Sequence, residues 1–536
     1  MAGVNPYAAA SETPAVLRQD SFQHPAQLTS QPIRIHAQSL ALPRSAPLVS
    51  DKLYSGFVEH LGRGIYGGIL DDPKKPSPDS ILEKQDKGNE RARGRLAWRK
   101  DVVKILAKDG ELEMPILPSH KRVELAWLST ETNHFGTDEF IDYCRELKLS
   151  PGSSYCNGTG DTYWANLRRK NTGRDEPHNA KYWGLGNEMH GPWQVGFLNA
   201  TDYTKMAKRW AHGMKLVDPS IKLVSCGNQG NSEWDREVLN GLIGAVDFHS
   251  IHLYSMLGHE HYSTVQRFDY KKNVFGPAAA ERSIAICASL IDLAKIDKAQ
   301  SLLDWNNRDQ KMAARDVKIC YDEWNVWDKV KTPGSQGLEQ AYDYTDMLGV
   351  VAWLNILVRK SKDVGIACIA QSVNVISPLM TSPEGLLFQT TYWPLRLFPR
   401  YMKNGRLLNL GFTPDTYEGP TYPEWIQHIS KPAYVDCVAI IVEQQESKRA
   451  SIRLSVLNRH PTADWNGNIS FEGFQIESVE SDVLSHDDLV AKNTFENPDV
   501  VVPKITKYSA KEWADQGSQP VRKYSWAFFI FEGTAL

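Results

Sequence analysis

Apolar residues in the middle of the chain fall into short runs that alternate with longer stretches of mixed polarity. A short apolar run bounded by turn residues predicts a buried strand, whereas apolar residues three and four positions apart predict a helix. The predicted strands are Tyr182–Leu185, Ile221–Cys226, Phe248–Tyr254, Ile319–Glu323 and Gly365–Val373. The helical segments that separate most of them are Ala200–Val217, Glu237–Ile243, Ala278–Ile296 and Gln340–Arg359. This repetition predicts an α/β fold with a parallel sheet wrapped by helices, most simply a (β/α)8 TIM barrel.

The pattern changes after Pro394, where the helical period disappears. Short runs of alternating apolar and polar residues take over, at Tyr434–Val442, Ala450–Asn458, Asn468–Gly473 and Ser525–Phe531. A period of two is typical of strands with one buried face, so we expect a C-terminal all-β sandwich of the jelly-roll kind. Ile33–Ala37 alternates in the same way and is expected to add a strand to this sandwich.

These patterns divide the chain into four parts. Residues 1–30 lack an apolar period and are expected to form a disordered tail, and residues 31–48 contribute to the sandwich. Residues 49–395 form the barrel, with a charged and proline-rich insertion near 71–97, and residues 396–536 form the sandwich. The early part of the barrel contains weaker signals, which predict strands at Leu53–Leu61 and Glu113–Leu117 and a helix at Thr137–Leu147.

Composition narrows the classes of function. The formal net charge is −3, from 61 basic and 64 acidic residues, so the chain lacks the charge signature of a nucleic-acid or membrane-surface protein. The seven cysteines are odd in number and form no CxxC pair, which argues against a disulfide framework and a zinc site. The N-terminus lacks a secretory pattern, and the apolar run Met347–Val358 is too short to span a bilayer. We therefore expect an intracellular protein that uses no metal or cofactor.

Two carboxylates stand at the ends of predicted barrel strands. Glu188 follows Tyr182–Leu185 in a loop punctuated by glycine and proline, and Glu323 ends Ile319–Glu323. Catalytic side chains of barrels collect where the strands end. Hydrolysis of a glycosidic bond needs an acid to protonate the leaving oxygen and a second carboxylate to attack the sugar or to activate water. Either residue alone fits a capping or solvated surface group equally well, but the pair favours catalysis.

Several segments carry a resemblance to a known family. They include EHLGR at 59–63, GNE at 186–188 and DEWN at 322–325, and they extend over residues 57–63, 124–140, 155–171, 181–194, 247–254, 320–327 and 369–385. From about residue 50 onward, the chain resembles the intracellular α-L-arabinofuranosidases of glycoside hydrolase family 51, which occur in fungi and bacteria. The resemblance implies a retaining exo-glycosidase built on a (β/α)8 barrel with an accessory β-sandwich.

The family pattern implies roles for individual residues. Glu188 is the general acid/base and Glu323 the nucleophile, while Asp322 is a neighbour of the attacking group. The implied substrate-binding residues are Glu59, Asn187, Tyr254, Gln371 and Trp193. The implied substrates are arabinan, arabinoxylan and derived oligosaccharides, from which terminal α-L-arabinofuranosyl residues are removed. A homo-oligomer is also in keeping with the family.

The implied contacts of these residues differ in kind. Asn187 is expected to hydrogen-bond the sugar 2-hydroxyl, a contact that strengthens in the transition state. Tyr254 is expected to orient the nucleophile, and Trp193 to form a wall of the pocket. His252, by contrast, is expected to be a hydrogen-bonded core residue.

The chain also departs from the family pattern. Residues 114–127 lack the segment that carries a substrate-contacting Asn, and the stretch between Leu149 and Tyr155 leaves no room for the third barrel strand, so we expect an incomplete barrel. His190 stands where the family has Trp or Asp. These departures leave two alternatives open. One is a catalytically impaired relative, either carbohydrate-binding or truncated, and the other is a related retaining barrel hydrolase acting on xylosides or glucans.

Overall fold

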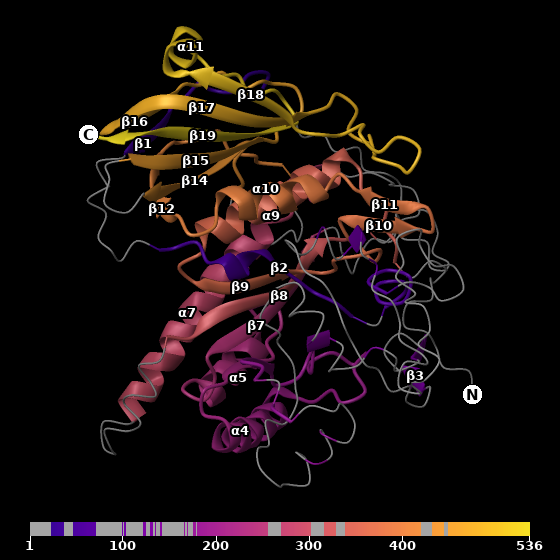
Figure 1. Cartoon of the computed structure of the whole chain (residues 1–536). Helices are drawn as coiled ribbons and strands as arrows, with labels where there is room; N and C mark the ends of the chain where they lie inside the picture. The colour runs from indigo at the N-terminus through magenta and orange to yellow at the C-terminus, as the bar shows by residue number, and fades with distance from the viewer. Residues whose placement is uncertain are drawn as a thin grey trace.

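The computed structural model describes residues 23–36, 47–59, 61–70, 179–255, 270–301, 316–328, 338–419, 431–443 and 449–536, together with short stretches between 99 and 177. Within these ranges a helix-wrapped parallel sheet lies beneath a β-sandwich (Figure 1). The predicted strand Glu113–Leu117, the insertion near 71–97 and most of the predicted helix Thr137–Leu147 lie outside the described residues. The segment between Leu149 and Tyr155 also lies outside them.

Six strands of the described chain form the parallel sheet, in the order β2-β9-β8-β7-β6-β5. They are β2 (Ser55–Gly56), β5 (Tyr182–Gly184), β6 (Lys222–Ser225), β7 (Phe248–Ser255), β8 (Lys318–Val326) and β9 (Val364–Ile369). The five strands predicted from apolar runs between Tyr182 and Val373 are therefore present. Most residues of β8 are buried whichever face they point to, which explains why its sequence is an apolar run rather than an alternation.

The first strand of the parallel sheet is much shorter than the predicted Leu53–Leu61. A 3-10 helix spans Asp51–Tyr54, and only Ser55–Gly56 pair with β9. The Ser50 side chain accepts a hydrogen bond from the Lys52 N–H and so caps the helical turn. Such a local side-chain bond competes with an extended chain, and an apolar pattern does not reveal it.

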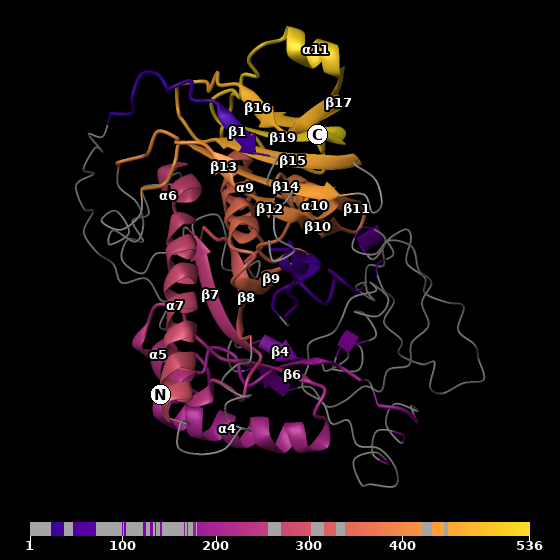
Figure 2. The ribbon, with the colours of Figure 1, turned by 90° about the vertical axis from the view of Figure 1, so that its left-hand side faces the viewer.

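Four helices follow strands of the sheet and cover it (Figure 2). They are α4 (Ala200–Val217), α5 (Glu233–Leu242), α7 (Ala278–Ser301), which the short α6 (Tyr270–Phe275) precedes, and α9 (Tyr344–Arg359). The predicted helical segments correspond to these four. In α9 every residue from Tyr344 to Val358 is buried. This helix lies between the sheet and the sandwich, so nearly all of its surface is apolar.

One helical stretch, Tyr270–Ala299, is long and apolar enough to cross a membrane by length and composition alone. In its most apolar window, 61% is buried inside the protein. Core helices of folded proteins pass the same test, so the stretch is weak evidence for a membrane span.

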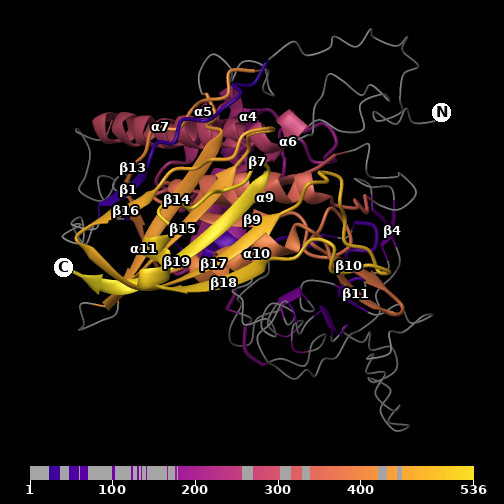
Figure 3. The same ribbon diagram turned by 90° about the horizontal axis from the view of Figure 1, so that it is seen from above.

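The sandwich is built from a six-stranded and a three-stranded sheet (Figure 3). The larger sheet contains, in order, β12 (Arg406–Leu408), β14 (Val435–Glu443), β15 (Arg449–Asn458), β19 (Ser525–Ala535), β17 (Phe474–Ser485) and β18 (Lys504–Ser509). The smaller contains β13 (Leu410–Gly411), β1 (Ile33–His36) and β16 (Ile469–Glu472). Because β1 pairs in parallel with β16, the N-terminal strand lies in the sandwich. A hairpin of β10 (Leu379–Ser382) and β11 (Gly385–Phe388) follows β9.

Helices persist beyond Pro394, contrary to expectation. α10 (Tyr392–Tyr401) contains both Pro394 and Pro399, and α11 (Ala510–Asp515) follows β18. Pro394 falls in the first turn of α10, where the backbone N–H has no intrahelical partner to lose. The sequence analysis also missed β17 and β18, whose frequent charged residues leave no apolar run to detect.

One hydrophobic cluster joins the barrel to the sandwich. It includes Trp353 of α9 and Trp526 of β19, and Phe398 of α10 stacks on Trp526 with 5.6 Å between the ring centroids. A polar contact crosses the same boundary, where the Asn355 side chain of α9 donates to the Asp436 carboxylate of β14 at 3.0 Å. The barrel and the sandwich are therefore packed as one body.

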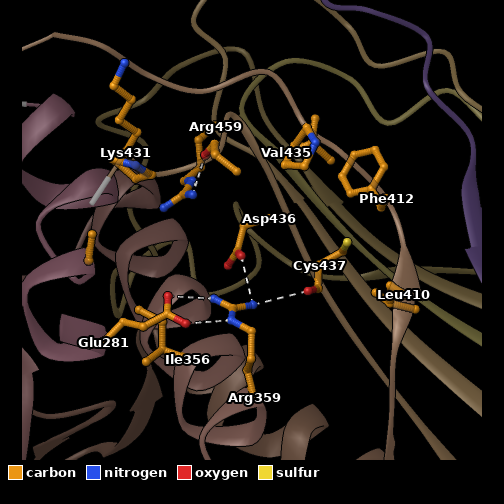
Figure 4. Close-up of a pocket in the computed structure, with 14 residues that line it drawn as sticks. Glu281, Ile356, Arg359, Leu410, Phe412, Lys431, Val435, Asp436, Cys437 and Arg459 are labelled. Atoms are coloured by element: carbon orange, nitrogen blue, oxygen red, sulfur yellow. Dashed lines mark hydrogen bonds and ion pairs between the residues drawn. The ribbon is translucent and has the colours of Figure 1, made fainter. Parts of the chain in front are cut away.

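A cavity of about 270 Å³ lies at the edge of this boundary (Figure 4). The guanidinium of Arg359 donates to both oxygens of Glu281, at 2.9 and 3.2 Å, and lies 3.0 Å from the Asp436 carboxylate. A second arginine, Arg459, donates to backbone carbonyls and lies over the Phe275 ring, 5.0 Å from its centre. None of the candidate catalytic residues lines this cavity.

Asp235 connects α5 to the sheet from a fully buried position. Its carboxylate accepts hydrogen bonds from the His249 ring at 3.1 Å, from the Ser232 hydroxyl at 2.6 Å and from the Asn228 N–H at 2.7 Å. Burial acts to raise the pKa of Asp235, but these bonds outweigh it and lower the pKa to about 2.

Acid is expected to weaken the fold through Asp235. Its pKa of about 2 in the folded chain lies below the ordinary 3.8, so folding favours the ionised form. The resulting stability, on the order of 2 kcal/mol, is fully present above about pH 4 and is lost as the pH falls towards about 2. Urea unfolding from about pH 7 down to about pH 3 measures it. Asp235→Asn should flatten the slope below about pH 4, whereas Glu233→Gln, on an 86% exposed side chain of the same helix, should not. An unchanged slope in Asp235→Asn would contradict this role.

Candidate active site

Glu188 lies in a tight loop that follows β5. Gly186 and Glu188 adopt positive φ angles of +111° and +47°, so the chain turns sharply at this point. A Cβ at position 186 would stand 2.7 Å from the Cγ of Met189, so the turn requires glycine. The Gly191 N–H closes the loop by donating to the Glu188 carbonyl at 2.8 Å. The indole N–H of Trp193 donates to the Glu188 carboxylate at 2.5 Å, which orients the side chain.

Glu323 and its neighbour Asp322 lie within β8. The register between β7 and β8 shifts between Ser250 and His252, and β8 accommodates an extra residue there. Such a bulge bends the strand and redirects side chains, so both carboxylates reach groups on β7. Glu323 is only 8% exposed and accepts a hydrogen bond from the Tyr254 hydroxyl at 2.8 Å. Asp322 accepts one from the Ser250 hydroxyl at 2.6 Å.

His252 lies between these carboxylates. Its Nδ1 is 3.1 Å from Glu188 Oε1 and 3.4 Å from Glu323 Oε2, and its Nε2 is 3.3 Å from Asp322 Oδ1. His252 is largely buried and hydrogen-bonded, as expected of a core residue, but its partners are the candidate catalytic carboxylates. The signal that could have revealed its place in the site is strand periodicity, because residues 252 and 254 share one face of β7 and Tyr254 was already assigned to the site.

The two glutamates approach each other closely. One oxygen of Glu188, one of Glu323 and a ring nitrogen of His252 all lie within 4.8 Å of one another. In retaining glycosidases the two carboxyl groups are about 5–5.5 Å apart, and in inverting ones about 6.5–9.5 Å, to leave room for a water molecule. The nearest oxygens of Glu188 and Glu323 lie within 4.8 Å, which is compatible with the shorter, retaining separation.

The three groups shift each other's proton affinity. Burial acts to lower the pKa of His252, but the charge of Glu323 and hydrogen bonds with Asp322 and Glu188 raise it well above 6.5. Burial acts to raise the pKa of Glu188, but the hydrogen bond and charge of His252 lower it below 4.5. For Glu323, burial dominates over the attraction of His252 and raises the pKa to about 7. An imidazolium therefore faces an ionised Glu188, while Glu323 binds a proton near neutral pH.

Glu59 and Gln371 come together at the ends of β2 and β9. The Gln371 amide donates to Glu59 Oε2 at 3.0 Å, and the Glu59 N–H donates back to Gln371 Oε1 at 3.2 Å. Gln371 is buried, and the charge of Glu59 contributes to the raised pKa of Glu323. These two predicted contacts thus adjoin the glutamate pair.

The remaining predicted residues lie in the loop of Glu188. Asn187 immediately precedes Glu188, and its side chain is exposed. Trp193 is 39% exposed and touches Glu188 through its indole N–H, so it borders the site. In the described chain, the atoms of Glu188, His252 and Glu323 are also of a type and spacing that a divalent cation accepts. Ion pairs of His252 with Glu188 and with Glu323 hold the two carboxylates at this spacing.

Two domain families match the chain. The family described as α-L-arabinofuranosidase 1 domain matches residues 153–275, which contain Glu188 and His252. The family described as α-L-arabinofuranosidase C-terminal domain matches residues 322–524, which contain Glu323. Both candidate catalytic carboxylates therefore fall in matched regions.

Curated relatives and solved structures agree with these matches. A probable α-L-arabinofuranosidase C of Aspergillus fumigatus is 41% identical over 472 residues, which cover 79% of this chain and 84% of the relative. An intracellular exo-α-(1→5)-L-arabinofuranosidase of Halalkalibacterium halodurans is 30% identical over 535 residues, 89% of this chain and 95% of the relative. The arabinose complex of the Thermotoga maritima α-L-arabinofuranosidase is 28% identical, with a TM-score of 0.72 over 94% of this chain and 100% of that structure. The predicted barrel with a β-sandwich is confirmed. The chain belongs to the α-L-arabinofuranosidases of glycoside hydrolase family 51.

Proposed function

We propose that the chain removes terminal non-reducing α-L-arabinofuranosyl residues with retention of configuration, using Glu188 as acid/base and Glu323 as nucleophile. The observation that carries this proposal is the pair of carboxylates, one from the loop after β5 and one from within β8, whose nearest oxygens lie within 4.8 Å of each other and of a ring nitrogen of His252. This close approach supports direct attack by a carboxylate, because inverting enzymes hold their two carboxyl groups about 6.5–9.5 Å apart.

Two displacements account for the chemistry. In the first, a Glu323 oxygen attacks the anomeric carbon while Glu188 gives its proton to the departing glycosidic oxygen, which leaves as an alcohol. In the second, Glu188 takes a proton from water, and the resulting hydroxide displaces Glu323 from the sugar. Arabinose leaves, and both glutamates return to their initial protonation states.

His252 supplies a route for the proton that Glu188 needs. Without substrate Glu188 is ionised and Glu323 tends to bind a proton, which is the reverse of what the first displacement requires. The Nδ1 of His252 lies against both carboxylates, so one imidazolium proton can serve either of them. Such a cluster titrates as a unit. Tyr254 favours the ionised nucleophile by donating a hydrogen bond to it.

We propose further that Glu59 and Gln371 bind hydroxyls of the arabinosyl ring, that Asn187 binds its 2-hydroxyl, and that Trp193 forms a wall of the pocket. Glu59 and Gln371 are already aligned by mutual hydrogen bonds beside the nucleophile. Aligned polar groups contribute most where charge develops in the transition state.

We infer that the substrates are arabinan, arabinoxylan and their oligosaccharides. The name of the Halalkalibacterium relative, an intracellular exo-acting (1→5) enzyme, supports this class and an intracellular location. We also propose that the chain divides into tail, barrel and sandwich at the boundaries given above, and that it assembles into a homo-oligomer.

Proton NMR of an aryl α-L-arabinofuranoside during hydrolysis tests the retaining mechanism. The first arabinose to appear should be the α-anomer, before mutarotation produces the β-anomer. An initial β-anomer would overturn the nucleophilic role of Glu323. An aryl xyloside run beside it separates the related xylosidase, which would turn over the xyloside faster. A folded sample inactive on both compounds would indicate the impaired relative instead.

A further inference from the structure

His190 occupies the loop between Glu188 and Trp193, where the family pattern has Trp or Asp. Its ring lies edge-on to Trp193, with 5.8 Å between centroids and an interplanar angle of 90°. Its other neighbour is Trp234, at 5.6 Å and 63°. Trp234 is held firmly, because its indole N–H donates to the Cys226 carbonyl at 3.0 Å. His190 thus connects a fixed part of the barrel to a partly exposed tryptophan.

Trp193 is partly exposed, and two further contacts hold it in the loop. It is 39% exposed, and its indole packs on the backbone of Gly191, where a Cβ would overlap the ring. The indole N–H nevertheless has to stay on the Glu188 carboxylate. The edge-on ring of His190 is a side-chain contact that restricts rotation of the indole.

His190 serves as a flat ring rather than as a charge. The charged groups around it are Glu188, His252 and Asp235, and it also bonds to the backbone of Gly227. Burial outweighs the attraction of the two carboxylates and lowers the pKa of His190 below 6.5, so the ring is neutral at neutral pH. Among the described residues its Nδ1 is buried and finds no hydrogen-bond partner. A phenyl ring would therefore reproduce the contacts with Trp193 and Trp234, although it would lose the hydrogen bond to the Gly227 backbone.

We propose that His190 is a positioning residue, which holds the Trp193 indole against Glu188 and thereby controls how well Glu188 protonates the leaving group. This rests on the acid/base role proposed for Glu188. If the Trp193 indole moves away, the ionised Glu188 carboxylate loses the hydrogen bond that the indole N–H donates to it. The orientation of the carboxylate towards the glycosidic oxygen is then no longer fixed.

The leaving group separates this role from a structural one. A nitrophenolate departs with little help from an acid, whereas a sugar alcohol has to be protonated as the bond breaks. Loss of positioning at Glu188 should therefore slow an arabino-oligosaccharide much more than a nitrophenyl arabinofuranoside. A general loss of folded protein would slow both substrates equally.

The test compares kcat/KM on these two substrates for His190→Ala, His190→Phe, Trp193→Phe and the double variant His190→Ala/Trp193→Phe. For His190→Ala we expect a loss of about tenfold on the oligosaccharide and less than about threefold on the nitrophenyl compound. His190→Phe should stay within about threefold of wild type on both, because it keeps the ring. The double variant should be no slower than Trp193→Phe, because the two residues act in series. Val195→Ala, on a 74% exposed side chain of the same loop, is the matched control and should behave as wild type.

Equal losses on both substrates, additive effects in the double variant, or a defect in His190→Phe as large as in His190→Ala would each overturn the proposal. His190→Leu, which keeps the volume without the flat ring, replaces His190→Ala if that variant does not fold. Glu188→Ala provides the separate check on the function itself. If Glu188→Ala slows both substrates equally, the acid/base assignment fails, whatever the His190 variants show.

Discussion

Glu323→Ala is expected to lower kcat about 10⁴-fold or more on every α-L-arabinofuranoside, whichever leaving group it carries. The attacking oxygen is removed, so no glycosyl-enzyme can form, and the acid alone cannot complete the first displacement. The Tyr254 hydroxyl would lose the carboxylate that accepts its hydrogen bond. Substrate binding should nevertheless change less than turnover. Steady-state kinetics with a nitrophenyl arabinofuranoside measure the loss.

Asp322→Asn is the matched control for this prediction, because the two carboxylates are adjacent on β8 and both contact His252. Asp322 bonds to Ser250 and does not face the Tyr254 hydroxyl, so a smaller loss is expected. If Asp322→Asn loses as much as Glu323→Ala and fails to form a covalent intermediate, the nucleophile has been assigned to the wrong residue of the pair.

The loss of activity in Glu188→Ala is expected to depend on the leaving group of the substrate. On an arabino-oligosaccharide kcat/KM should fall by about 10³-fold or more, because the alcohol has to leave as an alkoxide. On a nitrophenyl arabinofuranoside the first displacement should survive, and the glycosyl-enzyme should accumulate because no base activates water. Azide needs no base, so added azide should raise turnover and yield the α-arabinofuranosyl azide.

The anomeric configuration of the azide product is the decisive measurement, because the Glu188→Ala and Glu323→Ala variants are expected to give different anomers. Attack on the Glu323 ester gives the α-azide, whereas azide acting in Glu323→Ala would displace the leaving group directly and give the β-azide. A lack of azide stimulation in Glu188→Ala, in a sample whose melting matches wild type, would mean that Glu188 is not the acid/base.

Much of the barrel could be predicted because its strands are short apolar runs that end in polar loops. Glu188 follows such a run and Glu323 was predicted to end one, so both were singled out without knowledge of any contact, although β8 continues past Glu323 to Val326. The helices α4 and α9 were predicted for a related reason, since their patterns of apolar residues are long and uninterrupted. α10 was missed because the helical period was taken to disappear after Pro394, whereas Pro394 falls in the first turn of a helix, which tolerates proline.

The part that could not be predicted depends on register. His252 lies on the same face of β7 as Tyr254, but only the bulge between β7 and β8 brings it against Asp322 and Glu323 together. Bulges arise from pairing between strands distant in sequence, and no local pattern reveals them. The contact between the rings of His190 and Trp234 could not be predicted for the same reason, because the two residues are far apart in the chain.

The cluster that joins α9 to β19 has a consequence for how the molecule can be divided. A module attached by a linker can be deleted or exchanged, because each side of the linker keeps its own interior. Here Trp353, from the barrel, and Trp526, from the sandwich, lie in one hydrophobic core. Phe398 of α10 belongs to the same core and stacks on Trp526. Cutting the chain near residue 395 would leave an apolar wall facing water on both fragments. The two regions therefore constitute a single thermodynamic unit, which heat or denaturant dismantles in one cooperative step.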